Sequence, residues 1–268
     1  MRVAVLGASG VAGRQFVPLA QARGFNVLTQ RVDLFDLETL TAHLSGCDAV
    51  VNLVTSIPKA GGRGDWAVND RVRREGTGVL LAAAAAATVG LVVQQSVAML
   101  HCVSDAVPQT EDDPVAGAGA IASAFDMETL CRASLLDVRL VRGGLFYGPG
   151  TGREEQWQRE VRDPAFRIPG DGTAWWSPVH VADYASAVLA VLEHGAVRSA
   201  YIAAEDVPLQ LHELYGLLAT DAGVPPLQTG GVERMRSFRA SNARLRGLGW
   251  APAFHRAWRT MNAPPAAL

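Results

Sequence analysis

A glycine-rich loop placed directly after the first apolar run constrains this chain more than any other feature. The run Arg2–Leu6 is short, apolar and rich in β-branched residues, which is typical of a buried parallel strand. Residues 7–13, Gly-Ala-Ser-Gly-Val-Ala-Gly, follow with GxxGxxG spacing, and residues 11–23 then have the apolar spacing of a helix. Backbone N–H groups in such a loop can approach a diphosphate at the helix N-terminus, where the helix dipole favours negative charge. The loop therefore predicts a dinucleotide site that includes Gly7, Ser9, Gly10, Val11 and Gly13.

Strands and helices alternate along the rest of the first half of the chain. The expected strands are 25–29, 49–54, 91–95 and 138–141, and the expected helices are 37–44, 66–87 and 120–133. Strands separated by helices of this length form βαβ units and hence a parallel sheet covered on both faces. We predict an α/β fold with a Rossmann-like, doubly wound parallel sheet and an NAD(P)-binding domain over residues 1–150.

The alternation loosens after residues 147–150, Tyr-Gly-Pro-Gly. Residues 151–178 are rich in Gly, Pro, Arg and Trp, and further elements are expected at 181–192, 200–203, 209–222 and 241–247. We predict a smaller C-terminal substrate-binding lobe over residues 151–268, with its last strands able to cross back into the first domain.

Charge and cysteine content exclude several classes of protein. The 24 basic and 26 acidic residues leave a net charge of −2, whereas a nucleic-acid-binding domain usually has a basic excess. The three cysteines have neither disulfide-framework nor metal-site spacing. The longest apolar stretch, 79–87, is far shorter than the ~18 residues of a membrane span, and the N-terminal run is too short for a signal peptide. We expect a cytoplasmic protein with a small-molecule substrate and no metal, membrane or nucleic-acid partner, and a homodimer is left open.

The residues after the second expected strand bear on the choice of cofactor. An acidic side chain there binds the ribose 2′-hydroxyl of NAD(H), and an arginine suits the 2′-phosphate of NADP(H). Residues 30–33 are Gln-Arg-Val-Asp, and Arg31 favours NADP(H) over NAD(H). The alternative is that Arg31 is a solvated surface residue.

Taken in order, these segments resemble the short-chain dehydrogenase/reductase superfamily, and above all its extended, NAD-dependent epimerase/dehydratase-like and atypical branches. The matching segments run along the whole chain: the glycine loop, 33–36, 50–53, 75–77, 82–83, 94–96, 142–150, 179–183, 241–244 and 248–250. The resemblance implies that the cofactor site also includes Asp33, Leu34, Leu53, Thr55 and Ser96.

The residues that carry the superfamily's acid–base chemistry are missing. That chemistry uses a tyrosine hydroxyl, whose pKa is lowered by a lysine four residues later. With Ser123 and Glu128 placed on the corresponding helix, the tyrosine position holds Ala120 and the lysine position holds Ala124. The single lysine of the chain, Lys59, falls in an expected loop, so no Tyr-x-x-x-Lys exists in any register.

The superfamily's Ser/Thr hydroxyl position is also altered, because it falls on Val97 when Ser96 is matched to the first residue of the usual pair. Ser96 and His101 are the remaining catalytic candidates, and a buried, hydrogen-bonded histidine is the alternative for His101. Two arginines could face an anionic substrate, and two adjacent tryptophans could wall an aromatic pocket, although solvation and packing would also account for them. These substrate candidates are Arg63, Arg73, Trp175 and Trp176.

Three functions remain open. The first is an atypical NAD(P)-dependent enzyme that acts on a small organic molecule with another proton donor, such as His101, water or the substrate. The second is a non-redox cyclase, dehydratase or isomerase in which the cofactor is structural or absent. The third is a non-catalytic cofactor sensor or partner protein. The emptied catalytic helix fits all three, because fold alone does not determine function.

Overall fold

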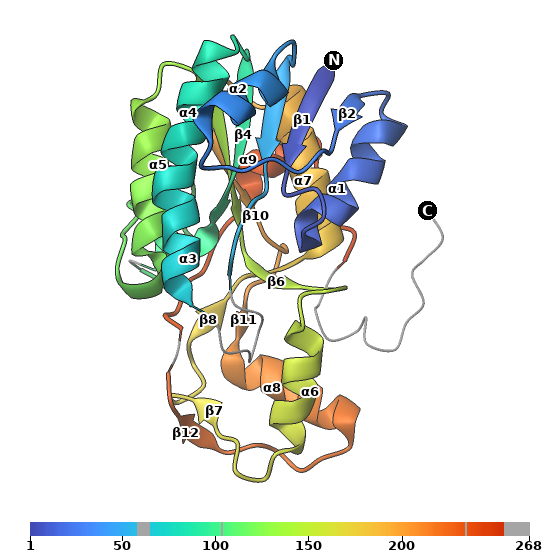
Figure 1. Ribbon diagram of the computed structural model, residues 1–268. Coiled ribbons are helices and arrows are strands. Elements are labelled where there is room, and N and C mark those ends of the chain that lie inside the picture. Colours follow the sequence, from blue (N-terminus) through green and yellow to red (C-terminus); the bar gives the residue numbers. More distant parts are fainter. Residues whose placement is uncertain (58–64, 103, 234, 255–268) are drawn as a thin grey trace.

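The computed structural model describes residues 1–57, 65–102, 104–233 and 235–254 (Figure 1). A parallel sheet with the order β10-β5-β4-β3-β1-β2 forms the centre of the upper part. Its strands are β1 (Arg2–Leu6), β2 (Asn26–Leu28), β3 (Ala49–Asn52), β4 (Leu91–Val97), β5 (Asp137–Gly143) and β10 (Ala200–Ala203). The predicted α/β, doubly wound parallel fold is therefore confirmed.

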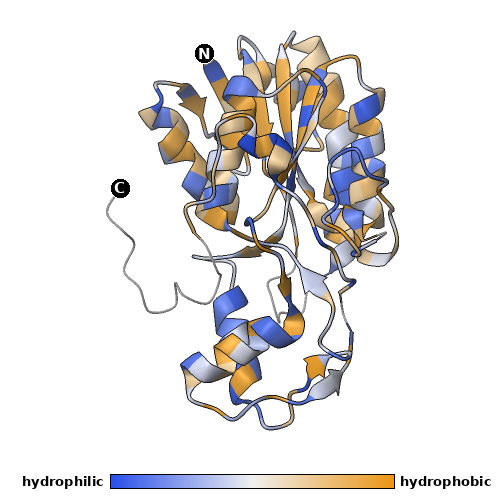
Figure 2. Ribbon diagram, turned by 180° about the vertical axis from the view of Figure 1, so that it is seen from behind, coloured by the Kyte–Doolittle hydropathy of each residue, from blue (hydrophilic) through white to orange (hydrophobic). Residues whose placement is uncertain are grey.

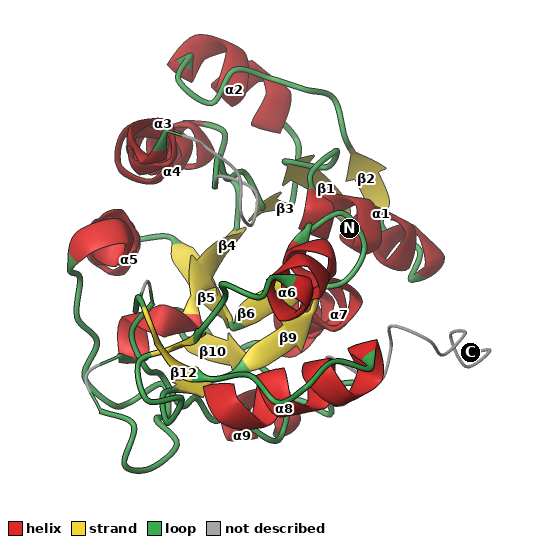
Figure 3. Ribbon diagram, turned by 90° about the horizontal axis from the view of Figure 1, so that it is seen from below, coloured by secondary structure: helices red, strands yellow, loops and turns green. Residues whose placement is uncertain are grey.

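Helices cover both faces of this sheet (Figure 3). One face carries α1 (Val11–Ala22) and α7 (Val181–His194), and the other carries α2 (Leu37–Leu44), α4 (Thr77–Ala86) and α5 (Ala122–Ala133). Alternate residues of a strand point to opposite faces, so in β1 Val3 packs with the α1–α7 layer and Ala4 with the opposite layer. The apolar strands lie between the two helical layers (Figure 2).

The helix expected over residues 66–87 is divided into three parts. It begins as α3 (Trp66–Arg71), widens into a π-helical turn, η1 (Val72–Gly76), and continues as α4. A π turn carries one extra residue and often occurs at functional sites.

A smaller lobe lies below the sheet (Figure 1). It contains α6 (Arg153–Arg162), α8 (Leu211–Ala222) and the short strands β7 (Ile168–Pro169), β8 (Trp175–Trp176), β11 (Leu209–Gln210) and β12 (Thr229–Gly231). The helix α6 was not expected, because its composition is polar and only Trp157 and Val161, four residues apart, are buried.

Several segments beyond residue 150 return to the upper part. The helix α7 and the strand β10 belong to the layers of the main sheet. The strands β6 (Leu145–Tyr147) and β9 (Pro178–His180) pair in parallel at the junction, and α9 (Ala243–Arg246) packs near β10. Backbone N–H groups of Ala253 and Phe254 donate to the carboxylate of Asp183 on α7, which fixes the last described residues against the sheet.

Candidate functional site

The glycine loop joins β1 to α1 in a conformation that requires two of its glycines. Gly7 has φ +81°, and a Cβ there would lie 2.7 Å from the carbonyl carbon of Leu53. A Cβ on Gly13 would lie 2.2 Å from the Gly7 carbonyl oxygen. Gly10 is the N-cap of α1, with no side-chain cap and no acidic residue in the first turn. The first N–H groups of α1 are thus open to an anion, and Ser9, Gly10 and Val11 lie at least partly exposed beside them.

The residues expected around the adenosine differ in their surroundings. Arg31 is exposed and forms no ion pair with any residue that the structure describes. The Asp33 carboxylate accepts from the backbone N–H of Phe35 at 2.9 Å, so it shapes the turn after β2. Leu34 is buried against Gly76, where a Cβ would lie 2.5 Å from its Cδ2 atom. Leu53 lies beneath Gly7, and Thr55 is exposed.

A shallow hollow, open to solvent, lies where β3 and β4 end beside the π turn. It brings together Thr55, Arg73, Ser96 and Val97, all of which were expected at the site. The full lining is Asn52, Val54, Thr55, Val72, Arg73, Thr77, Gln94, Gln95, Ser96, Val97 and Met127. In an open α/β sheet, ligands bind outside the carboxyl ends of the strands, which is where this hollow lies.

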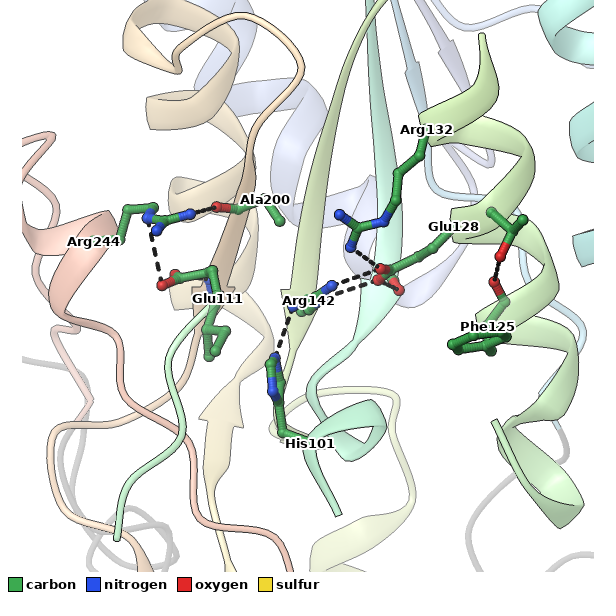
Figure 4. Close-up of polar contacts among 11 residues, drawn as sticks. His101, Glu111, Phe125, Glu128, Arg132, Arg142, Ala200 and Arg244 are labelled. Carbon is green, nitrogen blue, oxygen red and sulfur yellow. Dashed lines mark hydrogen bonds and ion pairs between the residues drawn. The ribbon is translucent and has the colours of Figure 1, made fainter. Parts of the chain in front are cut away.

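A buried charged cluster lies beside the hollow and connects β4, β5 and α5 (Figure 4). The Ser96 hydroxyl donates to the Glu128 carboxylate at 2.6 Å. The Arg142 guanidinium binds both oxygens of Glu128, at 2.9 and 2.6 Å, and Arg132 donates to the same carboxylate. Burial alone would raise the pKa of Glu128, but the bonds and charge of Arg142, together with the bonds from Ser96 and Arg132, outweigh it and hold the pKa below its usual value. Glu128 is therefore ionised, and the Ser96 hydroxyl is committed to it.

His101 lies next to Arg142 (Figure 4) and is not among the residues that line the hollow. Its Nε2 atom lies 2.7 Å from Arg142 Nη1. Because a guanidinium has only donors, this Nε2 must accept, which puts the proton of the neutral ring on Nδ1. Burial and then the charge of Arg142 lower the pKa of His101 to about 4. At neutral pH His101 is thus an uncharged acceptor that orients Arg142.

Ala120 and Ala124, which were matched to the superfamily's tyrosine and lysine positions, lie in different surroundings. Ala120 is exposed in the short 3₁₀ turn η3 (Gly119–Ile121), before α5 begins. Ala124 lies on α5 and is fully buried in an apolar cluster with Val97 and Leu100. The side of the site that would hold a lysine is therefore closed and apolar.

The two tryptophans lie in the lower lobe and not in the lining of the hollow. Trp176 is buried in the lobe core near Trp157, and Arg239 lies over the ring of Trp175 at 4.3 Å from its centre. Arg63 lies outside the described residues. Of the four substrate candidates, only Arg73 is placed in the hollow.

Sequence reasoning did not assign a function to the Glu128–Arg142 pair, nor to the buried hydrogen bond from the Tyr147 hydroxyl to Glu205, 2.6 Å long. Burial and then the charge of Glu205 raise the pKa of Tyr147, so this phenol is no acid at neutral pH. All four residues occur in the sequence as ordinary polar residues, and only tertiary pairing distinguishes them.

The described residues contain neither a candidate metal centre nor a candidate membrane span. No group of three or more His, Cys, Asp or Glu side chains in that part of the chain could hold a metal ion. No helix there is both long and apolar enough to cross a membrane.

Comparisons with known proteins place this geometry among nucleotide-dependent enzymes. The profile of the NAD-dependent epimerase/dehydratase family matches residues 3–204. A Streptomyces protein named 3-diazoavenalumate denitrifying reductase is 29% identical, over 97% of this chain and 98% of its own length.

Solved structures show the same fold at lower identity. The dTDP-glucose 4,6-dehydratase of Streptomyces venezuelae, solved with NAD, has a TM-score of 0.81 at 24% identity, covering 98% of each chain. RMD from Pseudomonas aeruginosa, solved with NADPH, has a TM-score of 0.78 at 23% identity, covering 96% of this chain and 95% of its own.

Proposed function

The chain belongs to the NAD-dependent epimerase/dehydratase family, and we propose that it is an NAD(P)H-dependent reductase of a small organic molecule that works without the tyrosine–lysine pair. The protein is an atypical member in this proposal, because its substrate takes up hydride without receiving a proton from the enzyme.

The glycine loop and the turn after β2 fit the cofactor. Gly7 and Gly13 leave no room for a Cβ, and the open N-terminus of α1 suits a diphosphate. Arg31, exposed and unpaired in the described chain, suits a 2′-phosphate and favours NADPH. The bound cofactor supplies the hydride.

The observation that carries the proposal is that the described residues that line the hollow include no acid for neutral pH. Val97 and the nearby Ala124 are apolar, and the Ser96 hydroxyl donates to an ionised carboxylate. The remaining polar lining consists of amides, threonine hydroxyls and Arg73. None of these groups loses a proton readily near pH 7. Reduction of a carbonyl substrate creates an alkoxide, and these lining residues offer no acid to protonate it.

A diazonium carbon is a substrate that suits such a site. Hydride takes the place of nitrogen on the carbon: a C–H bond forms, the C–N bond breaks, and its electron pair leaves with N₂. Aryl diazonium and NAD(P)H thus give arene, N₂ and NAD(P)⁺, and no proton is consumed. The name of the Streptomyces relative, a denitrifying reductase of a diazo compound, supports this class.

The test is to mix the protein with NADPH and 4-carboxybenzenediazonium. We expect NADPH oxidation above the rate without protein, with one benzoate formed for each NADPH consumed. The rate of NADPH oxidation should stay constant between pH 6 and 8, because no enzyme acid has to be protonated for the reaction.

The matched control is the variant Gly10→Asp, which places a carboxylate where the diphosphate would lie. It should return NADPH oxidation to the rate without protein. Equal rates with the wild type and with this variant would show that the reduction takes place outside the site, and the proposal would be wrong.

A further inference from the structure

Three arginines follow one another closely at the π turn, and one of them differs from the other two. Arg71 pairs with Glu75, and Arg74 pairs with Asp126 and Asp70, all on the protein surface. Arg73 is only 5% exposed. Within the described ranges it forms no ion pair, and its hydrogen bond is to the Ser123 hydroxyl, at 3.3 Å.

A buried guanidinium without a carboxylate is costly, because one neutral hydrogen bond does not replace the water that it has lost. Burial lowers the pKa of Arg73, and the charge of the more distant Asp70 partly offsets this. Because buried charges are normally paired, an anion from outside the chain would complete this group. In this case Arg73 lines the hollow, so its unused donors lie beside the space open to a ligand.

A second group in the same lining also lacks a partner. The Oε1 atom of Gln95 is buried and accepts no hydrogen bond from any described residue. This oxygen is an acceptor, so a donor group of a ligand would satisfy it, whereas the forked cationic donor of the hollow is Arg73 on the π turn. Arginine binds planar carboxylates and other oxyanions in a forked geometry that few other side chains provide.

We propose that Arg73 is the anion-recognition residue of the substrate site and that the substrate carries an ionised oxygen, a carboxylate or a phenolate. The aromatic ring that bears this oxygen, and the reacting group on that ring, rest on the proposed function, whereas the recognition of the anion does not.

The charges also orient such a substrate. A diazonium cation is repelled by the guanidinium, and its anionic oxygen is attracted to it. The anionic end therefore lies at Arg73, and the reacting carbon lies away from it, toward the apolar side chain of Val97. A substrate with both charges would be selected over one that has only the cation.

The experiment uses two unreactive probes, benzoate and benzamide, which differ in charge but little in shape. Calorimetric titrations with saturating NADP⁺ compare the wild type with Arg73→Gln and Arg73→Lys, and Arg71→Gln is the matched control on the surface. We expect benzoate to bind the wild type about 10- to 100-fold more tightly than benzamide, as a charge-assisted hydrogen bond allows.

Arg73→Gln should abolish that preference, Arg73→Lys should retain part of it, and Arg71→Gln should leave it unchanged. NADP⁺ affinity should be the same in all four proteins. Benzoate affinity in Arg73→Gln or Arg73→Lys equal to that of Arg71→Gln would overturn the proposal, and so would a loss of NADP⁺ affinity without a loss of benzoate affinity. Because the titrations need no turnover, they remain decisive even if no diazonium is reduced.

Discussion

Acid destabilisation through His101 is a quantitative consequence of the buried cluster. The ring is fully buried, accepts from Arg142, and has its pKa lowered from 6.5 to about 4. The charged groups that act on it are Arg142, Glu128, Asp113 and Arg132. Between the two pKa values the unfolded chain binds a proton that the folded chain does not. The contribution of His101 to the free energy of unfolding is therefore fully present above pH 6.5. It decreases as the pH falls and is lost below about pH 4.

The size of this effect follows from linkage. The two pKa values lie about 2.5 apart, and a free energy of about 1.4 kcal/mol corresponds to each pH unit in that window. The free energy of unfolding should thus fall by about 2.5 kcal/mol between pH 7.5 and pH 4.5 on account of His101 alone.

The assay is urea unfolding at pH 7.5, 5.5 and 4.5 for the wild type and for His101→Gln. Glutamine supplies a neutral acceptor to Arg142 and does not titrate. Burial also lowers the pKa of His180, to about 4, but that group is common to both proteins, so the difference between them isolates His101. The variant should lose about 2.5 kcal/mol less than the wild type over this range. Parallel pH dependence in the two proteins would refute a neutral His101.

Further predictions concern the glycine loop, the Glu128–Arg142 pair, and positions 120 and 124. Gly10→Asp should stay folded, because aspartate is a favourable N-cap, but should lose at least about 100-fold in NADPH affinity through repulsion of the diphosphate; Gly10→Ala, titrated in parallel, should keep most of it. Glu128→Gln leaves Arg142 buried without its anion and should cost about 3–5 kcal/mol in urea unfolding, whereas Asp126→Asn, on the exposed side of the same helix, should change little. Ala120→Tyr with Ala124→Lys should not raise NADPH-dependent turnover of a diazonium, because no proton is needed; a gain of about 10²–10⁴-fold, the usual worth of acid–base assistance, would contradict the proposed chemistry.

Local features of the fold could be predicted from the sequence. The first strand, the glycine loop and the first helix follow one another directly, and Asp36 caps α2 through Thr39 as its type and position indicate. The break in the long central helix could not be predicted, because the π turn depends on packing around Gly76 and Leu34 as well as on propensity. The polar helix α6 is stabilised by the burial of Trp157, which its own sequence does not indicate.

The sequence indicated several residues of the candidate site, but not which of their side chains would contact one another. Arg73 was a substrate candidate in the sequence, but nothing there shows that it is buried without a carboxylate while Arg71 and Arg74 form surface ion pairs. The role of Glu128, on α5, depends on its pairing with Arg142. That arginine lies on β5, the next strand of the chain, and only the packing of the helix on the sheet brings the two side chains together. Trp176 is apolar enough for either a pocket wall or a core, and the lobe core contains it.

The most direct test of hydride transfer from the cofactor to the substrate carbon is the fate of a deuterium atom carried by the cofactor. NADPH labelled with deuterium at the transferable position of the nicotinamide is mixed with the protein and 4-carboxybenzenediazonium in ordinary water, and the benzoate is analysed by mass spectrometry. We expect one deuterium on the ring carbon that carried nitrogen, and none when unlabelled NADPH is used in D₂O. Benzoate that takes its new hydrogen from solvent, or oxidised cofactor without benzoate, would contradict this expectation.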